Sequence, residues 1–480
     1  MREMRETLDV RREMLDVRRE MLDVRREMLD VRRKTLDDRR NFSHLPSHGS
    51  LRLARRNFSR LTSHVSLRLA RRYFSHLTSH VSRLLHVSLV ALFVLAVVAP
   101  ARADFLGDTL KPFASVTEMY DSNIFRVRDR AQLRGLIGEE RLGDFITVAS
   151  VGTGVRYRLS RQELDLLVRR DFIRYAHYSD QDVDRDEANG TVTLALLDAL
   201  RVRIDGAYAK TPEARTDYRS AAVNRRRNMA AGISAGYVMT SGLGFEAAYR
   251  RLTVDYSLPQ YRTSEYYIDR YAGTVSYRIS PEARLYATYQ RDETEYDQPL
   301  VLGPTAVNNS NSADSIRVGL DKTVGPKTSL SCYVGYLNRR HKASSARDFS
   351  GVIGKVAASY ALTAKLGFLL NWERQLYEET YADRIYSVTD AIGAGFAYQF
   401  TPKVKGTVFD RLSWKDFRDV PGSGVAPRSD FTQELNAGVE WAPFTRLTVS
   451  AGYQYARRSS DDPSFDYSDH VATTAVAYRF

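Results

Sequence analysis

The sequence predicts an all-β protein: a transmembrane, antiparallel, up-and-down β-barrel of about 18 strands, with 16 also possible, preceded by a signal peptide. From about residue 110 to Phe480, alternating segments of 10 to 16 residues are joined by breaks that are in turn very short and long and polar. This rhythm is typical of a sheet that runs up and down through a membrane, because turns on one side only reverse the chain while loops on the other side can grow. Such a sheet must close on itself, since an open edge has no hydrogen-bond partners in lipid.

Residues 1–80 form a low-complexity, Arg-rich extension built from two tandem repeats. A seven-residue unit, LDVRREM, comes first, and a 16-residue unit then begins at Arg39, Arg55 and Arg71. The heptads permit a short coiled coil. A signal peptide normally starts a chain, however, so we expect translation to start near Val81 and the extension to be absent from the mature protein.

Residues 81–103 are predicted to be a secretory signal peptide. Their apolar run, Leu84–Ala99, is 16 residues long, which is short for a membrane-spanning helix. Ala101 and Ala103 occupy the small-residue positions before a signal-peptidase cut. Cleavage after Ala103 would leave 104–480 as an outer-membrane β-barrel of a Gram-negative bacterium, exported through the general secretory pathway. A retained membrane anchor is the alternative.

The net charge of +13 belongs mostly to this leader. The first 103 residues hold 22 of the 71 Lys and Arg and 11 of the 58 Asp and Glu, which leaves 49 basic against 47 acidic residues in the barrel. A nearly neutral barrel does not predict nucleic acid as a partner. The single cysteine, Cys332, excludes an intramolecular disulfide. We expect it to face lipid, with a free reactive thiol as the alternative.

The breaks between the predicted strands sort by length. Most of the short ones contain Pro or Gly, as at Ser280-Pro281 and Gly325-Pro326, and they alternate with long polar ones. This sorting favours a membrane barrel over a soluble sandwich. An even strand number puts both chain ends on the side of the short breaks, the periplasm. The predicted strands cover 112–120, 144–159, 162–178, 188–198, 200–210, 226–240, 243–256, 265–280, 282–296, 311–324, 327–341, 348–362, 364–378, 385–400, 403–417, 429–442, 445–458 and 468–480.

Side chains alternate between apolar and polar along these segments. In 445–458, Leu447 and Val449 share one face and Thr448 and Gln454 share the other. Alternation alone does not separate a barrel from a sandwich, so the signal peptide, the sorted breaks and the aromatic content decide for the barrel. The tyrosines expected to form interfacial girdles near strand ends are Tyr157, Tyr256, Tyr296, Tyr360, Tyr398 and Tyr478.

The chain ends with alternating apolar residues and a terminal aromatic residue, namely Val476, Tyr478 and Phe480. This ending resembles the signal by which the barrel-assembly machinery recognises outer-membrane barrels. After a signal peptide and about 17 similar strands, it supports an outer-membrane destination, with outer-membrane lipid and lipopolysaccharide as surroundings.

A barrel of 16 to 18 strands is wide enough for an aqueous channel. Its polar face suits a hydrated polar solute, and an anionic one in particular because Arg predominates among the cations. The alternative is that these charges pair across the lumen and only keep the barrel wet and rigid. A bulge would also change the face of every residue beyond it. The lumen-wall candidates chosen by parity are Arg156, Arg158, Arg203, Asp205, Glu246, Arg250, Arg278, Arg284, Gln290, Asp292, Arg317, Asp321, Lys355, Asn371, Glu373, Glu434, Asn436, Glu440 and Gln454.

Two acidic stretches fall in predicted outer loops, where function usually concentrates. A contact with divalent cations or lipopolysaccharide is conceivable there, but ordinary solvated loops are the favoured interpretation. The acidic residues are Asp180, Asp182, Asp184, Asp186 and Glu187 in the first stretch and Asp461, Asp462, Asp466 and Asp469 in the second.

Catalysis, metals and cofactors are not predicted. The chain has no Gly-x-Ser-x-Gly elbow and no paired His or Cys metal pattern. A lipid-facing Ser/His hydrolase would need a histidine of the mature chain, all three of which are predicted at outer strand ends, beside a serine and a third orienting group. These histidines are His177, His341 and His470, and the nearby serines are Ser344, Ser345 and Ser468.

The start of the mature chain carries a family resemblance. Pro112-Phe113 leads into Tyr120-Asp121-Ser122-Asn123-Ile124-Phe125, ahead of Tyr-rich strands and a terminal Phe. Together these features resemble the β-barrel porin family that includes EpsL-type outer-membrane proteins of exopolysaccharide biosynthesis operons, over essentially all of 104–480. The resemblance implies a role in exopolysaccharide production or export, in bacteria whose surface polymers support biofilm. It implies no catalytic residues.

Three functions therefore compete. An exopolysaccharide exit channel or accessory barrel is favoured, a general or substrate-selective porin for small polar solutes is second, and a surface enzyme or adhesin is a remote third. A loop that crosses the lumen would favour the porin, whereas an open lumen lined by Arg and Tyr would favour passage of a polymer.

Overall fold

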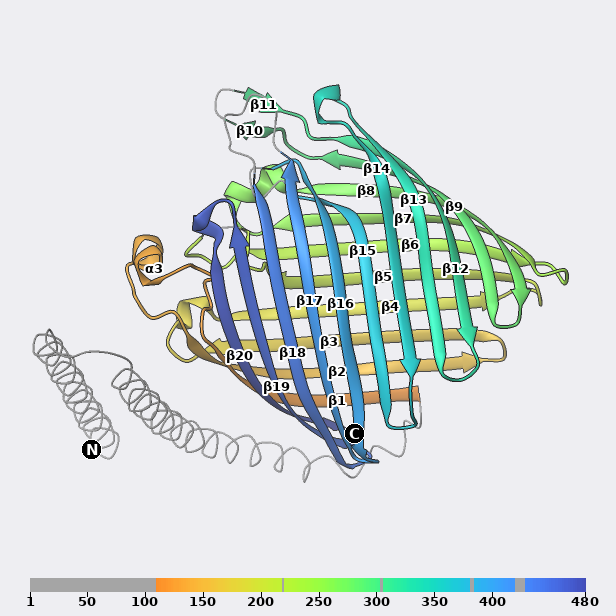
Figure 1. Cartoon of the computed structure of the whole chain (residues 1–480), viewed down its shortest axis with the longest axis horizontal. Coiled ribbons are helices and arrows are strands. Elements are labelled where there is room, and N and C mark those ends of the chain that lie inside the picture. Colours follow the sequence, from red (N-terminus) through yellow and green to blue (C-terminus); the bar gives the residue numbers. More distant parts are fainter. Residues whose placement is uncertain (1–108, 218–219, 303–304, 380–383, 419–427) are drawn as a thin grey trace, which may run out of the picture. The chain divides into compact units, whose positions relative to one another are not determined.

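The computed structural model describes residues 109–217, 220–302, 305–379, 384–418 and 428–480. Over these ranges the chain forms one closed antiparallel barrel of 18 strands (Figure 1), so the predicted fold class is confirmed. The strands are β1 (Leu110–Asp121), β2 (Asp144–Leu159), β3 (Gln162–Tyr175), β4 (Val183–Ala195), β5 (Leu200–Pro212), β6 (Arg225–Val238), β7 (Leu243–Tyr256), β8 (Tyr266–Ser280), β9 (Ala283–Tyr296), β12 (Asn311–Val324), β13 (Thr328–His341), β14 (Phe349–Ala361), β15 (Leu366–Glu378), β16 (Tyr386–Thr401), β17 (Val404–Arg418), β18 (Ser429–Phe444), β19 (Leu447–Ser460) and β20 (Tyr467–Arg479).

The first and last strands close the barrel. β1 pairs antiparallel with β20 from Phe113 opposite Arg479 to Asp121 opposite Val471. Beyond the last pair, the backbone N–H of Phe480 donates to the carbonyl of Pro112 over 3.0 Å. Closure gives every strand two neighbours, which removes the unpaired edge that lipid would not tolerate.

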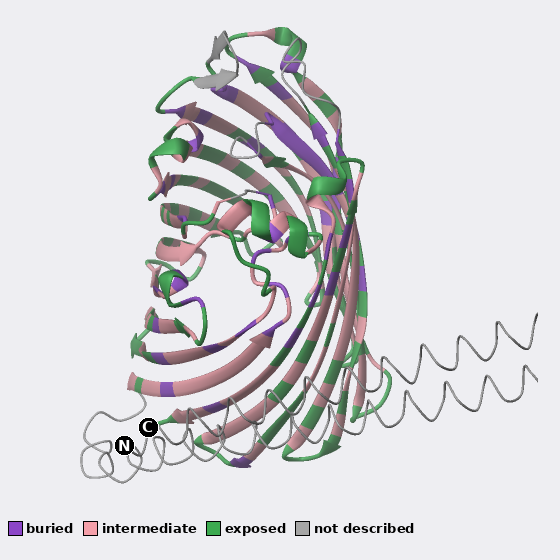
Figure 2. Ribbon diagram, turned by 90° about the vertical axis from the view of Figure 1, so that its left-hand side faces the viewer, coloured by how far each residue is buried: buried purple, intermediate pink, exposed green. Residues whose placement is uncertain are grey.

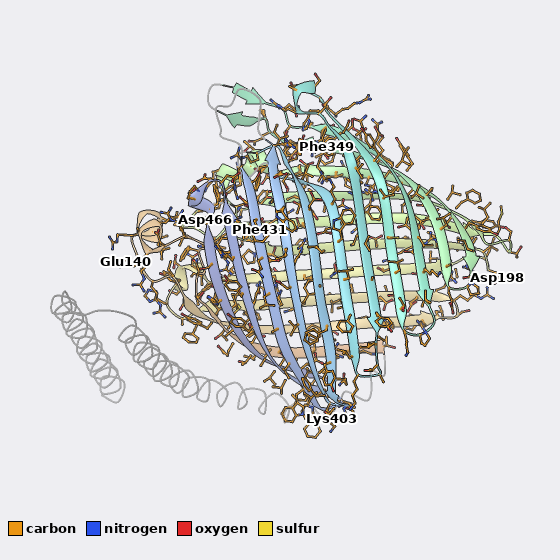
Figure 3. The ribbon with its side chains drawn as sticks, in the orientation of Figure 1. Glu140, Asp198, Phe349, Lys403, Phe431 and Asp466 are labelled. Carbon is orange, nitrogen blue, oxygen red and sulfur yellow. The ribbon has the colours of Figure 1, made fainter. Side chains whose placement is uncertain are left out.

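The short turns and the long loops lie at opposite ends of the barrel, as predicted. Asp198 and Lys403 lie in short turns at one end, and Glu140 and Asp466 lie in long loops at the other (Figure 3). Gly242 and Gly325 have positive φ angles of 87° and 57° in two of the tight turns, a conformation that favours glycine. In outer-membrane barrels the long loops face the cell exterior, and here the start of β1 and the end of β20 both lie at the opposite, short-turn end.

Three local features differ from the sequence prediction. β4 begins at Val183 rather than 188, because Asp184 and Asp186 pair with Arg170 of β3 instead of staying in a solvated loop. A two-stranded hairpin, β10 (Leu300–Leu302) with β11 (Thr305–Val307), lies within a long loop. A helix, α3 (Arg130–Ile137), lies between β1 and β2.

The wall is only half-paired at one place. β14 and β15 are hydrogen-bonded from Gly354 opposite Arg374 down to Ala361 opposite Gly367, and their outer parts are not paired with each other, although each is paired with its other neighbour. All other neighbouring strands are paired along more of their length. The outer part of the wall between β14 and β15 is thus held by side chains rather than by the backbone ladder.

Large apolar side chains cover one face of the wall. Ile316, Val334 and Val352 are 61%, 60% and 52% exposed and lie on adjacent strands. Figure 2 shows exposed and less exposed residues alternating along the strands, as the period of two requires. Within the described ranges, no helix is both long and apolar enough to cross a membrane.

The tyrosine girdle is only partly as expected. Tyr157, Tyr360 and Tyr398 lie on the apolar face near the short turns and are exposed. Tyr256 and Tyr296, in contrast, are each only 8% exposed and pack with Tyr266 and Val254 at the opposite end of the wall. These two tyrosines were expected in the girdle because they lie near strand ends. Whether a side chain faces lipid also depends on which face of the strand it occupies, and Tyr256 and Tyr296 occupy the inner face.

Cys332 lies on the apolar face, opposite Leu320 and Val356 on the neighbouring strands. We expect a membrane-soluble maleimide to label it in vesicles and a charged, water-soluble maleimide not to label it until the protein is unfolded. A matched control moves the thiol by one residue, with Ser331→Cys in a Cys332→Ser background, where the charged reagent should react. Rapid reaction of native Cys332 with the charged reagent would contradict this orientation.

Candidate functional site: a lumen crossed by the β5–β6 loop

The inner face of the wall is identified by a contact between distant strands. Asp217, in the loop between β5 and β6, contacts Lys415 of β17, Arg428 just before β18 and Arg458 of β19. Since β5 and β19 are separated by five intervening strands on the shorter way around, the loop reaches these residues only across the interior. Figure 2 looks toward the barrel from the long-loop end and shows loop and helical segments within the ring of strands.

Asp217 is held by a compact cluster of ions. Its Oδ1 accepts from Arg428 Nη2 over 2.9 Å and from Arg458 Nη1 over 2.8 Å, and its Oδ2 lies 3.5 Å from Lys415 Nζ. Arg428 also donates to Asp430 over 2.9 Å, and Arg458 donates to the carbonyl of Thr216. Arg428 and Arg458 are 2% and 5% exposed, so the cluster is shielded from bulk water.

The near side of the same loop rests on the first two long loops. The guanidinium of Arg215 lies 4.4 Å from the centroid of the Phe125 ring and donates to the side chain of Gln181. Gln181 Nε2 in turn donates to the carbonyl of Ala221 over 3.0 Å. The loop is therefore held by the β1–β2 and β3–β4 loops as well as by the ion cluster, and it is a crossing segment rather than a free surface loop.

Electrostatics favour the ionised form of Asp217. Burial raises its pKa, but Lys415, Arg458 and Arg428 outweigh burial and hold the pKa well below its usual range. Glu379 differs, because burial raises its pKa although Lys415 Nζ lies 2.7 Å from its Oε1. Lys415 is therefore shared by two carboxylates of unequal acidity, and Asp217 is the one that keeps its charge in acid.

A second group of contacts narrows the outer lumen beside the half-paired wall. Glu378 Oε2, at the end of β15, accepts from Tyr296 over 2.7 Å and from Arg339 over 2.9 Å, although β14 lies between β13 and β15. The Arg339 guanidinium lies 5.0 Å from the centroid of the Tyr386 ring, and Tyr386 stacks on His341. The outer end of β15 and β16 thus packs onto the inner face of β13.

Strand register places every predicted lumen-wall residue on this inner face. Register shifts occur only near the short turns, at Arg278/Ser280, Gln399/Thr401 and Trp441/Phe444, so they do not change the parity of the wall. Several of these residues pair with an acid or a base that is also on the inner face, as Arg250 does with Asp205 over 2.9 Å. Whether the set lines the path of a solute stays a prediction. The other such pairs are Arg156–Asp165, Arg158–Glu163, Arg270–Asp292 and Arg411–Glu373.

The sequence reasoning missed the crossing segment and its anchors. Asp217 sits in a polar loop with no local signal, and its partners follow it by about 200 residues or more in the chain. The parity that assigned other lumen residues would also have assigned Lys415 and Arg458 to the inner face. Nothing in the sequence would have joined them to Asp217.

The acidic residues whose contacts are described form ion pairs or a helix cap within the fold. Asp184 and Asp186 pair with Arg170 on the outer face of the wall, and Asp469 pairs with Arg126 over 3.0 Å. Within the described ranges, no three His, Cys, Asp or Glu side chains gather as a metal-ligand set. Asp462 caps the short helix Pro463–Phe465.

The histidines do not assemble a hydrolase triad in the part of the chain that the structure describes. His177 Nε2 lies 3.0 Å from Glu139 Oε2, and His470 Nδ1 lies 2.7 Å from the Tyr453 hydroxyl. Both ring nitrogens of His341 are buried without a hydrogen-bond partner in that part of the chain. His341 and His470 were expected at outer strand ends. His341 is the last residue of β13, and His470 is the fourth residue of β20.

The motif behind the family resemblance builds the outer end of β1. Asn123 Nδ2 donates to the carbonyls of Val127 and Ser468 over 2.7 and 3.1 Å. Asp121 accepts from the backbone N–H of Asn123 and from Arg126. Phe125, 1% exposed, packs against Tyr178. These residues therefore tie the β1–β2 segment to the wall.

A closed barrel with an apolar outer face, a charged inner face and a crossing loop defines an outer-membrane channel of the porin class. The chain belongs to the family described as putative beta-barrel porin 2, whose model matches residues 106–480. Membership of this porin family makes it an outer-membrane channel rather than an enzyme.

Three solved structures illustrate the similarity in fold. OpdK from Pseudomonas aeruginosa is 12% identical, with a TM-score of 0.41 over 77% of this chain and 98% of that one. OccK2 (OpdF) from the same organism is 12% identical, with a TM-score of 0.45 over 77% and 98% of the two chains. OccAB3 from Acinetobacter baumannii is 11% identical, with a TM-score of 0.41 over 77% and 99%. No curated protein matches the sequence.

Proposed function

We propose that this chain is a porin through which small polar solutes cross the outer membrane, and that the β5–β6 loop limits their size. The observation that carries the proposal is the anchoring of Asp217 across the lumen. A loop held by buried ion pairs at Asp217 and by the contacts of Arg215 with Gln181 and Phe125 would keep the barrel narrow. A permanent narrowing suits selection among small solutes more than passage of a wide polymer.

The test is solute uptake by proteoliposomes that contain protein purified from outer membranes. We expect neutral sugars to enter at rates that fall steeply with size, and ion conductance to appear in planar bilayers. Liposomes with the same amount of heat-unfolded protein provide the control. A folded, reconstituted protein that passes neither ions nor monosaccharides would overturn the proposal.

Exopolysaccharide export is the second candidate. The family resemblance supports it, and so does a row of Arg and Tyr side chains on the inner face of β9, β12 and β13. A deletion strain distinguishes the two functions. Normal polymer secretion with reduced permeability to small sugars is the result expected of a porin. Lost secretion with unchanged permeability would favour export.

We also propose the route by which the barrel reaches the membrane. Cleavage after Ala103 and recognition of Val476, Tyr478 and Phe480 by the barrel-assembly machinery would complete it; the leader, 1–103, lies outside the described residues. The register places Val476 and Tyr478 together on the outer face, and the rings of Tyr478 and Phe480 lie 5.0 Å apart. The outward-facing aromatic end of β20 supports this proposed recognition.

A further inference from the structure

A hollow of about 530 Å³ lies on the wall toward the short-turn end, away from the crossing loop. It spans β8, β9, β12, β13, β14 and β15, and most of its inward side chains are polar. The volume is in the range of small-molecule sites. Its lining residues include Arg278, Arg284, Asp321, Ser331, Ser359 and Asn371, whereas Tyr286, two residues after Arg284 on β9, lies beyond its lining.

Two like charges face each other in this hollow. Arg278 of β8 and Arg284 of β9 are directly opposite in register, and both are exposed. Among the described residues, neither forms an ion pair. Asp321, the register partner of Arg284 on β12, accepts instead from Ser331 Oγ over 2.7 Å. Like charges directly opposite each other destabilise a sheet. An anion held between the two guanidinium groups would remove this repulsion.

A row of tyrosines continues from Arg284 along the same face. The Arg284 guanidinium lies 5.7 Å from the centroid of the Tyr286 ring. The same ring lies over Gly319, and a Cβ atom added to Gly319 would come within 2.3 Å of Tyr286 Cζ. Arg317 repeats the arrangement 5.5 Å from the centroid of Tyr333. Glycine therefore lets Tyr286 lie flat against the wall, which presents a ring face beside the cationic pair.

We propose that Arg278, Arg284 and Tyr286 form a subsite for small hydroxylated carboxylates, of which a sugar acid is the simplest example. The two guanidinium groups would bind the carboxylate in forked hydrogen bonds, and Ser331, Ser359 and Asn371 would bind hydroxyl groups. The flat ring of Tyr286 would receive the apolar face of the sugar. The inference rests on the proposed porin function and adds a preferred class of solute to it.

The experiment compares uptake of galacturonate and galactose by proteoliposomes, since the two differ mainly by one carboxylate. The test variant is Arg278→Gln/Arg284→Gln. The matched control is Arg156→Gln/Arg158→Gln, which removes the same charge from the same end of the lumen, but from arginines already paired with Asp165 and Glu163. Arg278→Lys/Arg284→Lys keeps the charge and loses the fork. Heat-modifiable migration in gels verifies that each variant is folded.

For the wild type we expect saturable galacturonate uptake. The Gln test variant should raise the galacturonate half-saturation concentration by about tenfold, the limit for two exposed charged contacts. The Lys variant should restore part of the affinity, and galactose uptake should not change. Equal losses in the test and control variants, or wild-type galacturonate uptake that does not saturate, would overturn the subsite while leaving the porin intact. A wild type that passes neither sugar would instead overturn the porin function.

Discussion

Replacing Asp217 by Ala is expected to raise the single-channel conductance severalfold. The change removes the shared anion of Lys415, Arg428 and Arg458, so the crossing loop loses its anchor on the far wall. Removing one partner from a buried ionic cluster should also lower the free energy of unfolding by about 3 kcal/mol. Planar-bilayer recordings and thermal unfolding in detergent measure the two effects.

A matched control for this variant is Asp205→Ala, which removes a lumen carboxylate paired with one half-exposed arginine, Arg250. That change should leave the conductance nearly unaltered. Equal conductances of the wild type and Asp217→Ala would show that Asp217 does not hold the loop in place.

The pH dependence of the anchor follows from the sign of the Asp217 shift. Because the pKa of Asp217 is lower in the folded state, its carboxylate stabilises the crossing loop fully at pH values above the usual Asp pKa of about 3.9. This stabilisation is lost only as the pH falls through the depressed pKa. Conductance should therefore show no loop opening between about pH 8 and about pH 5. Opening within that range would mean that a different group holds the loop.

Glu378→Ala is expected to be the most destabilising single change in the wall. Arg339 is 1% exposed and, among the described residues, pairs only with Glu378, so the variant leaves a buried cation without a counter-ion. The expected loss is about 3–5 kcal/mol of unfolding free energy, measured by denaturant unfolding followed by circular dichroism. The Tyr296 hydroxyl also loses its acceptor.

The double variant Glu378→Ala/Arg339→Met should recover most of that stability, because it replaces an orphaned charge with an apolar side chain of similar length. Glu293→Ala is the control, since Glu293 pairs with Arg291 on the exposed outer face. A Glu378→Ala barrel as stable as the Glu293→Ala barrel would contradict a supporting role for this contact.

The strand number, the sorted loops and the two faces could be predicted because they follow from local patterns. A period of two along 429–444 or 447–460 is read from neighbouring residues, and tight turns carry their own Pro and Gly signals. The helix α3 also had a local signal, since Asp129 caps it through Gln132 N while Gln132 accepts from Arg128 N. That spacing lies within the long break predicted between 120 and 144.

The lumen contacts could not be predicted for a different physical reason. Asp217 and Arg458 are 241 residues apart, and no periodic pattern links a loop residue to the opposite wall. The same holds for Tyr296 and Glu378, which meet because β15 leans inward where its pairing with β14 ends. The strands of the wall can be predicted from neighbouring residues, whereas the constriction depends on which distant loops meet inside the closed wall.

The pairing of β1 with β20 sets the order of events during folding. Ser122 and Asp469 are hydrogen-bonded at 347 residues apart, so β1 waits without its second neighbour until the last strand has been synthesised and exported. The entropy of closing so long a loop rises only slowly, by about 0.6 kcal/mol for each doubling of its length. Closing the barrel is therefore limited by the delay rather than by the entropy of loop closure, because an unpaired β1 edge can pair with any other strand before β20 arrives. Protection of the β1 edge until β20 arrives is therefore a requirement for closing the barrel that is separate from the stability of the finished wall.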